Sequence, residues 1–262
     1  MKKDFLETLR RLYRQRFKSG LAPIQPAEEI IPSLKKDGIV TLPGFYSKEF
    51  CNDVIKSIDQ YIELNKINAE KIQAKVKDPA FKRGVPMEDG TNYWIDSLGS
   101  DKRIMFSEKL SPNINSFSQN TKFLNQGQAL LGHALKLEYT MANRTSFLSN
   151  NLGSGGGWHR DNNYQHGYKA LVYLTDVNDT NGPFEYLKQT FTLKNHLIDF
   201  PYPDKYQFTD EEISKFIAKY PHLYTRLTAS AGTVVLFNVN AIHRGMPLKQ
   251  GVRYALTNYY NW

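Results

Sequence analysis

Two side chains near the middle of the chain, His159 and Asp161, are potential metal ligands and lie two positions apart. In an extended strand, residues i and i+2 point to the same face, so both can reach one ion. The strongest candidate for a third ligand is His243, which follows the apolar run GTVVLFNV. Two imidazoles and one carboxylate leave coordination positions open, an arrangement typical of non-haem Fe(II) sites that use dioxygen.

Arg253 adds an anion-binding group ten residues after His243. A turn over 245–251 lets the chain reverse, so that VRYALTNYY runs beside the strand that ends at His243. A buried arginine needs an anionic partner, and a guanidinium binds a carboxylate through two parallel hydrogen bonds. A dicarboxylic acid with one end on Arg253 and the other on the metal fits this pattern. The His-x-Asp spacing alone arises easily by chance, so the prediction depends on the combination.

Three glycines, 155–157, stand directly before Trp158 and the metal motif. Glycine loses more backbone freedom on folding than any other residue, so a run of it indicates a special backbone path. We expect these glycines to let the chain approach the cavity mouth, with Trp158 packed beside the metal. The alternative is a hairpin tip without a function.

The second half of the chain contains the elements that must position these groups. From Leu135 onward, short apolar or alternating runs such as KALVYLTDV are separated by turn signals such as NDTNGP. This pattern of short strands and turns is typical of an all-β sandwich or barrel. One helix interrupts the strands, because Thr209 and Glu212 have the spacing of a capping box.

The first half of the chain is expected to be more mixed. We predict a short strand over 39–42, a helix that begins after Ser47, and a further helix over 113–132. Residues 78–103, rich in Pro, Gly and charge, are expected to form a long loop. The segments 79–103 and 191–222 would then border the site and decide substrate choice.

The N-terminal segment 1–33 is expected to be a basic amphipathic helix followed by a Pro-containing linker, with residues 34–262 forming the main domain. Residues 1–20 contain seven basic and two acidic side chains, and their apolar residues fall at helical spacing. Such a helix packs on the domain with a solvated basic face, or contacts an anionic membrane surface or a partner.

Composition excludes several classes. The net charge of +8 is concentrated in the N-terminal segment, which argues against nucleic acid as a partner of the main domain. No apolar run approaches the roughly 20 residues that a transmembrane helix requires. The single cysteine, Cys51, excludes an internal disulfide framework and favours a reducing, cytoplasmic location.

Four segments resemble the phytanoyl-CoA dioxygenase-like family of Fe(II)/2-oxoglutarate oxygenases, and they span roughly residues 34–260. They are LKKDGIVTLPGF, GGGWHRDNN, KALVYLTDVNDTNGPFEYLKQT and GTVVLFNVNAIHRGMPLKQGVRYALTNYY. The resemblance implies a mainly β fold with flanking helices around a double-stranded β-helix (jelly-roll, cupin-like) core. It implies Fe(II) on His159, Asp161 and His243, 2-oxoglutarate on Arg253, and dioxygen as the oxidant.

The resemblance also suggests further site residues. NRTSF is similar to the strand before the metal motif in the ectoine hydroxylase branch, which implies Ser146 near 2-oxoglutarate and Arg144 facing substrate. Tyr173 belongs either to the core or to the 2-oxoglutarate site. Trp158 and Asn163 are candidates for substrate contact.

The chain departs from the family pattern at two places. Lys188-Gln189-Thr190 stands where members often carry Gly-Ser-His, and Gly245 stands where a hydroxyl residue often follows the distal histidine. The first departure concerns substrate contacts, and the second removes one hydrogen bond to 2-oxoglutarate. Asp161 fills the position that a halogenase leaves empty for halide, which disfavours that activity.

The sequence therefore predicts a dioxygenase that hydroxylates a C–H bond of a small molecule and releases succinate and CO2. One alternative is a non-catalytic β-barrel binding protein that retains the metal pocket. Another is a metal-dependent isomerase or hydrolase on a cupin-like barrel, which would need neither Arg253 nor oxygen. Acyl-CoA, amino acid, sugar and small natural product all remain open as substrates.

Overall fold

The computed structural model describes residues 30–161, 167–192, 199–200 and 206–261. The expected N-terminal helix and Asn163 lie outside these residues. Within them, no helix is both long enough and apolar enough to span a membrane.

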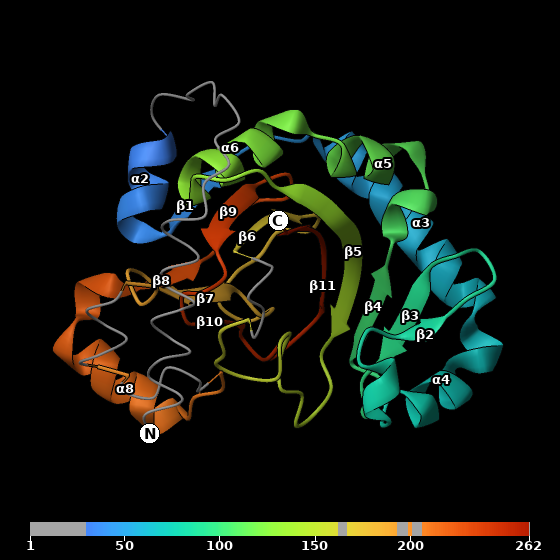
Figure 1. Ribbon diagram of the computed structural model, residues 1–262. Coiled ribbons are helices and arrows are strands. Elements are labelled where there is room, and N and C mark those ends of the chain that lie inside the picture. The colour runs from blue at the N-terminus through green and yellow to red at the C-terminus, as the bar shows by residue number, and fades with distance from the viewer. Residues whose placement is uncertain (1–29, 162–166, 193–198, 201–205, 262) are drawn as a thin grey trace.

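Two antiparallel sheets form the core, as expected for a jelly roll (Figure 1). The large sheet has the order β1-β9-β6-β11-β5-β4-β3-β2, and the small sheet has the order β10-β7-β8. The strands of the large sheet are β1 (Ile39–Leu42), β2 (Val85–Pro86), β3 (Asn92–Ile95), β4 (Asp101–Met105), β5 (Lys136–Ser146), β6 (Tyr168–Tyr173), β9 (Val234–Asn238) and β11 (Val252–Asn261). Those of the small sheet are β7 (Phe184–Leu187), β8 (Tyr224–Leu227) and β10 (His243–Gly245).

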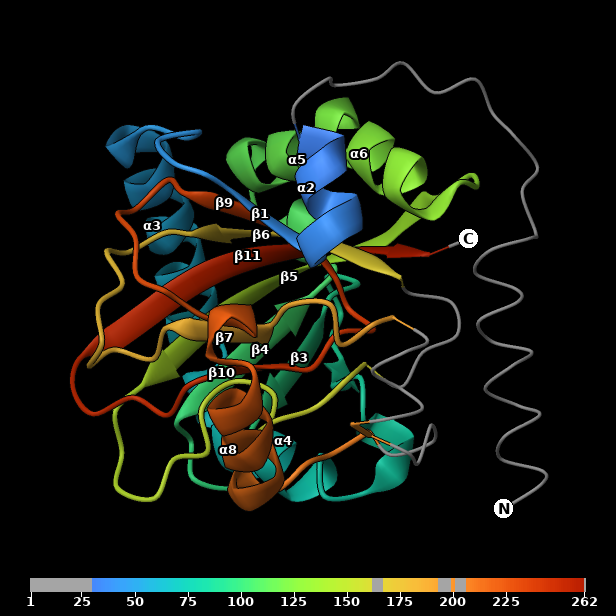
Figure 2. The same cartoon turned by 90° about the vertical axis from the view of Figure 1, so that its left-hand side faces the viewer.

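Helices cover the outer face of the large sheet, whereas α8 lies beside the small sheet (Figures 1 and 2). The helices are α2 (Ile30–Asp37), α3 (Lys48–Leu64), α4 (Ala69–Lys75), α5 (Pro112–Ser118), α6 (Thr121–Leu131) and α8 (Asp210–Lys219), with 3-10 turns at Lys66–Asn68, Pro79–Phe81, Ser107–Lys109 and Pro221–Leu223. The predicted caps are confirmed: Ser47 accepts a hydrogen bond from the Phe50 amide, and Thr209 forms a capping box with Glu212.

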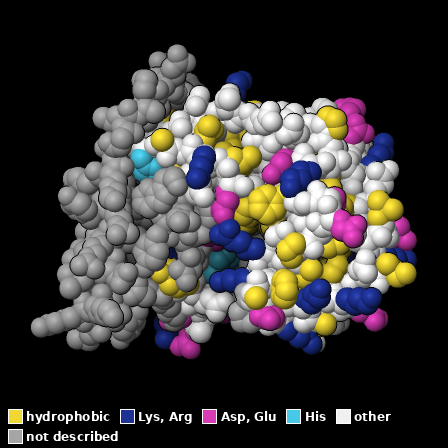
Figure 3. Space-filling view, turned by 45° about the vertical axis from the view of Figure 1, so that its right-hand side comes forward, with side chains coloured by type: hydrophobic (Ala, Val, Ile, Leu, Met, Phe, Trp, Pro, Cys, Tyr) yellow, Lys and Arg dark blue, Asp and Glu magenta, His cyan; other side chains and the backbone are white. Residues whose placement is uncertain are grey.

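Alternate residues of each strand in the large sheet face opposite sides. One face packs against the helices and forms the main core, where Ala142, Val172, Leu236 and Leu256 are fully buried. The other face lines a hollow between the two sheets. Figure 3 shows this hollow, with a histidine at its base between lysine and arginine side chains and hydrophobic side chains beside it.

The prediction of a long loop over 78–103 is wrong, because this segment contains β2, β3 and the start of β4, which extend the large sheet. Tyr93 and Ile95 alternate with partly buried neighbours and are buried against α3 and α4, which is the pattern of a half-buried strand. These strands have at most five residues and end at glycines and charges, so their pattern is too short to dominate the composition.

Two helix boundaries also differ from expectation. The helix over 113–132 is two helices, because α5 ends at Ser118 with Gln119 as its C-cap. Asn120 then caps α6 by accepting a hydrogen bond from the Lys122 amide. Residues 30–33, expected in the linker, form the first turn of α2.

Candidate metal centre

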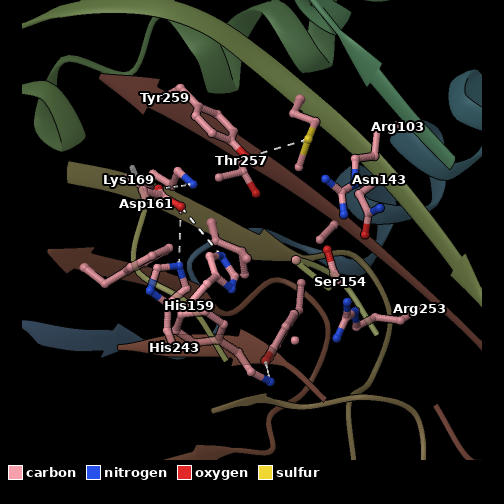
Figure 4. Close-up of a pocket in the computed structure, with 18 residues that line it drawn as sticks. Arg103, Asn143, Ser154, His159, Asp161, Lys169, His243, Arg253, Thr257 and Tyr259 are labelled. Carbon is pink, nitrogen blue, oxygen red and sulfur yellow. Dashed lines mark hydrogen bonds and ion pairs between the residues drawn. The ribbon is translucent and has the colours of Figure 1, made fainter. Parts of the chain in front are cut away.

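The structure brings His159, Asp161 and His243 together. His159 follows the glycine run and pairs with β10, where its amide donates to the His243 carbonyl at 3.0 Å and its carbonyl accepts from the His243 amide at 2.9 Å. Asp161 Oδ1 lies 3.7 Å from His159 Nε2 and 3.8 Å from His243 Nε2 (Figure 4). One ligand atom from each residue lies within 4.8 Å of the other two, so all three can contact one ion.

Backbone carbonyls fix the orientation of both imidazoles. Nδ1 of His159 lies 2.8 Å from the Gly157 carbonyl oxygen, and Nδ1 of His243 lies 2.9 Å from that of Ala241. Because a carbonyl only accepts, each Nδ1 must carry the proton, which leaves the lone pair of each Nε2 directed at Asp161. Neutral imidazole in this tautomer is the form that binds metal.

Burial keeps both imidazoles neutral. Burial, followed by the effect of the neighbouring His159, lowers the pKa of His243 from its ordinary value to about 3. Burial also lowers the pKa of His159, against the opposing effect of the Asp161 carboxylate. Both side chains are therefore ready to coordinate at neutral pH without first losing a proton.

Lys169, which no sequence pattern singled out, forms an ion pair with Asp161, the third candidate ligand. Its ammonium lies 2.5 Å from Asp161 Oδ2 and 4.0 Å from the ring centroid of Tyr259. Burial alone would raise the pKa of the Asp161 carboxyl, but Lys169 and the two histidines hold that pKa below its usual range. One visible signal was a lysine inside the apolar run YKALVY, since such a position is buried only when the charge is paired.

The donor set fits a divalent ion of the Fe(II) type. Two imidazole lone pairs and one ionised carboxylate oxygen converge on one point, and Lys169 occupies the second oxygen. Three protein ligands leave positions for exogenous ones. Within the described part of the chain, no other group of three or more His, Cys, Asp or Glu side chains is arranged to hold an ion.

Arg253 is buried and unpaired at the other end of the same cavity, on β11 (Figure 4). Its Nε has no hydrogen-bond partner, and no described carboxylate lies within ion-pair distance of it. Burial lowers the pKa of this guanidinium. A buried cation without a partner is unfavourable, so this position calls for an anionic ligand.

Gly245 leaves room for that guanidinium. A Cβ at this position would lie 3.1 Å from Arg253 Nη2 and 2.9 Å from the Ser154 Cβ. The departure from the family pattern at this residue therefore has a steric reason in this chain. The cavity between the triad and Arg253 has a volume of about 250 Å³, and its walls include Leu171, Tyr173 and Thr257.

The glycine run has a structural reason as well. Gly155 has φ +96°, and a Cβ there would lie 2.3 Å from Cε1 of His159. Glycine is thus required where the chain passes over the metal-facing imidazole. Close approach of the chain, rather than a simple hairpin tip, accounts for this residue.

Two other predicted residues have mainly structural contacts. Tyr173 lines the cavity, but its hydroxyl donates to the Leu227 carbonyl at 3.1 Å and accepts from the Phe184 amide at 2.9 Å. Trp158 does not line the cavity; it is buried in an apolar cluster, and the Arg244 guanidinium lies 4.4 Å from its ring.

Arg144 and Ser146 are not brought to the cavity. Thr145 pairs with the cavity-facing Arg253, so its two neighbours in β5 must point to the helix-covered face. There, Arg144 Nε donates to the Tyr254 hydroxyl at 2.9 Å. The residues of β5 that do line the cavity are Met141 and Asn143, opposite Arg103 of β4.

Comparison with known proteins agrees with this geometry. A sequence model described as phytanoyl-CoA dioxygenase (PhyH) matches residues 34–250. No curated protein matches the chain. Among solved structures, the non-haem α-ketoglutarate-dependent carbocyclase SnoK from nogalamycin biosynthesis is 15% identical, with TM-score 0.60 over 90% of this chain and 84% of that one.

Two further structures share the fold. EctD from S. alaskensis in its apoform is 16% identical, with TM-score 0.60 over 94% of this chain and 82% of its own. HygX from Streptomyces hygroscopicus with nickel and 2-oxoglutarate bound is 14% identical, with TM-score 0.56 over 90% of this chain and 87% of its own. These likenesses show the jelly-roll fold.

Proposed function

The chain belongs to the phytanoyl-CoA dioxygenase family and is an Fe(II)- and 2-oxoglutarate-dependent dioxygenase, and we propose that it hydroxylates a C–H bond of a small molecule with release of succinate and CO2. One observation carries the proposal: three converging metal ligands and an unpaired, buried guanidinium share one cavity. A chelating dicarboxylate is the ligand that satisfies both ends at once.

His159 Nε2, His243 Nε2 and Asp161 Oδ1 are the atoms that would hold Fe(II). When bound, iron together with 2-oxoglutarate and dioxygen supplies the oxidising power for C–H cleavage. Lys169 engages the second oxygen of Asp161, and so keeps that carboxylate oriented with a single oxygen toward the histidines.

Arg253 would bind the distal carboxylate of 2-oxoglutarate. Its guanidinium offers parallel donors in a fixed plane, the geometry that a carboxylate accepts. Because the site is buried, the ion pair is little screened by solvent and selects for a dianion of the right length. Tyr173 stands beside this position and contributes to its wall.

Apolar side chains keep water from the metal side of the cavity. The Phe184 and Phe237 rings lie 5.5 and 5.4 Å from the His243 imidazole. They restrict the rotation of that ring and lower the local polarity. Both effects favour reaction with the bound substrate over reaction with bulk water.

Succinate formation tests the proposal. The purified protein with Fe(II), 2-oxoglutarate and air should form succinate slowly without substrate and faster with one. His159→Ala should reduce this to the no-enzyme background, and Arg253→Gln should chiefly raise the KM for 2-oxoglutarate. Metal binding without succinate from the wild type would support the non-catalytic barrel, and turnover without oxygen would support an isomerase or hydrolase.

We also propose that residues 34–262 act as one domain and that the enzyme works in the cytoplasm. The family match over 34–250 supports the first statement, and the single, buried thiol of Cys51 supports the second. The basic segment 1–20 would contact an anionic surface. Removal of residues 1–29 should then abolish co-sedimentation with anionic vesicles without changing succinate formation.

A further inference from the structure

We propose that Arg103 binds a carboxylate of the substrate at the wall of the metal cavity, and that the substrate is a small organic acid with an apolar or aromatic body. This inference rests on the proposed function, because it assigns Arg253 to 2-oxoglutarate. Arg103 comes from β4, in the segment that the sequence suggested to be a loop.

The Arg103 guanidinium presents an unused edge to the cavity. Nε and Nη2 donate to the same oxygen, Asp101 Oδ2, at 2.9 and 2.5 Å. This single-oxygen contact differs from the bidentate pairing that a carboxylate and a guanidinium otherwise prefer. Nη1 has no partner among the described residues, and 23% of the side chain is exposed.

Neighbouring side chains hold the Arg103 guanidinium in place. Its guanidinium carbon lies 4.5 Å from the Trp94 ring centroid, and Asp101, with 3% of its side chain exposed, is itself held by a hydrogen bond from Asn143 to Oδ1. Thr145 in turn donates to the Asn143 side-chain oxygen at 3.0 Å. A donor held in place before its ligand arrives loses little conformational entropy on binding.

The charges in the cavity leave one positive charge unmatched. Three cations line it, Arg103, Lys169 and Arg253, against one lining carboxylate, Asp161, and Asp101 behind Arg103. Together with a divalent metal, these cations carry five positive charges. Asp101, Asp161 and the 2-oxoglutarate dianion carry four negative ones. A substrate with one negative charge balances the closed site, whereas a neutral or cationic substrate does not.

The surface next to Arg103 is apolar and aromatic. Met105, Tyr139 and Met141 form a small cluster together with Trp94 and Tyr259. The Tyr139 and Tyr259 rings stack with centroids 4.5 Å apart. Of these residues, Met141 and Tyr259 line the cavity, and the others support them. This wall suits the body of the substrate, while Arg103 fixes its acidic end and so sets which carbon faces the triad.

Benzoate and benzamide test the proposal, because they have nearly the same shape and differ in charge. Each is titrated calorimetrically into the protein loaded with Mn(II) and saturating 2-oxoglutarate, which keeps Arg253 occupied. We expect benzoate to bind at least about tenfold more tightly than benzamide, and Arg103→Gln to remove that advantage, as expected for loss of a charge-assisted hydrogen bond. Arg103→Lys should retain part of it, because the charge remains.

Lys102→Gln is the matched control. Lys102 is the next residue back on β4, points to the opposite face and borders a separate surface pocket with Arg144. The Lys102→Gln substitution removes one positive charge from the protein without changing the cavity, so the affinity for benzoate should not change. Thermal unfolding of each variant shows whether it is folded.

Three results would overturn the proposal: equal binding of benzoate and benzamide to the wild type, unchanged selectivity in folded Arg103→Gln and Arg103→Lys, or parallel losses of benzoate and 2-oxoglutarate affinity. The last result would assign Arg103 to the cosubstrate. Failure of the proposed function is distinguishable, because it appears as absence of succinate from the wild type, whatever the outcome for benzoate.

Discussion

The two faces of the large sheet are made of alternate residues of the same strands, but their buried polar groups differ in whether they have hydrogen-bond partners. On the helix-covered face of β11, the Asn258 amide donates to the Phe117 carbonyl at 3.0 Å and accepts from Thr140 at 2.7 Å. On the cavity face of the same strand, Arg253 is equally buried and has no such partner.

This difference separates stability from function within one sheet. A buried polar group without a partner costs free energy, and proteins retain such groups where a ligand completes them. The helix-covered face also leaves some neutral groups, such as the Ser146 and Tyr168 hydroxyls, without a partner among the described residues. The cavity face leaves a charged group unpaired, and it is complete only with a cation at one end and anions at the other. Substitutions on the cavity face should therefore reduce activity without loss of stability, and substitutions on the helix-covered face should reduce stability without loss of activity.

The largest effect is expected from His243→Ala, on the cavity side. Loss of one of three ligands should reduce succinate formation to the no-enzyme background, because the two remaining side chains bind metal weakly. The measurement is succinate with Fe(II) and 2-oxoglutarate in air, and circular dichroism should show a folded protein. Residual turnover near the wild-type level would show that the metal lies elsewhere.

Leu236→Ala, on the helix-covered side, should show the reverse signature. Leu236 is fully buried in the main core, so its truncation should cost about 2–5 kcal/mol of unfolding free energy. Urea denaturation measures this loss. The kcat per folded molecule should be unchanged, and a loss of kcat without a loss of stability would break the distinction between the two faces.

Lys169→Met should produce a smaller effect, on metal affinity. The change removes the partner of Asp161 Oδ2 and keeps most of the side-chain volume. Loss of an outer partner of a metal ligand typically weakens binding by about 10–100-fold. A Co(II) titration monitored by absorbance measures the affinity, and Lys169→Arg should recover part of it. Equal affinities for wild type and Lys169→Met would leave Lys169 with a purely structural role.

The smallest effect is expected from pH on the metal-free protein. The pKa of His243 is about 3 in the fold against an ordinary value of 6.5, so the unfolded chain binds more protons between these values. Stability is therefore complete above pH 6.5 and falls as the pH drops toward 3, by up to about 1.4 kcal/mol per pH unit for one group.

Urea denaturation with a chelator at several pH values between 7 and 5 tests this slope, and His243→Gln should make it shallower. His159 shifts in the same direction and contributes to the slope in both proteins. The Asp161 carboxyl, whose pKa is also depressed, stays ionised throughout this range. An identical slope in His243→Gln would show that other groups govern the acid sensitivity.

The candidate metal ligands were predictable because their chemistry is visible in single residues. His159 and Asp161 were expected to share a face by spacing alone. The expected place of His243 at the end of the apolar strand is wrong, because β9 ends at Asn238 and His243 begins β10 in the other sheet. β11, expected beside that apolar strand, pairs with β5 and β6 instead.

Lys169 was missed because a lysine becomes informative only when its partner is known, and Asp161 approaches it through the fold. Arg103 was missed because its strand is short and carries charge at three successive positions, Asp101 to Arg103.

Two predicted site residues lie on the other face of the sheet, because side chains alternate between the two faces along a strand. A shift of one residue moves every side chain of a strand to the other face. The resemblance placed Arg144 and Ser146 toward the ligand, but the pairing of Thr145 with Arg253 places them toward the helices. Sequence patterns predicted a sandwich or barrel of short strands, and the family resemblance implied the jelly roll, whereas the register between strands required the structure.

The three candidate metal ligands differ in how far their side chains are exposed. The exposed fractions of the His159 and Asp161 side chains are 18% and 16%, whereas that of His243 is 4%. We therefore expect an incoming ion to meet the first two before the third, so that its capture ends at the deepest imidazole. We expect a chelator to remove the ion along the same route in reverse, past the chain segment that carries the glycines.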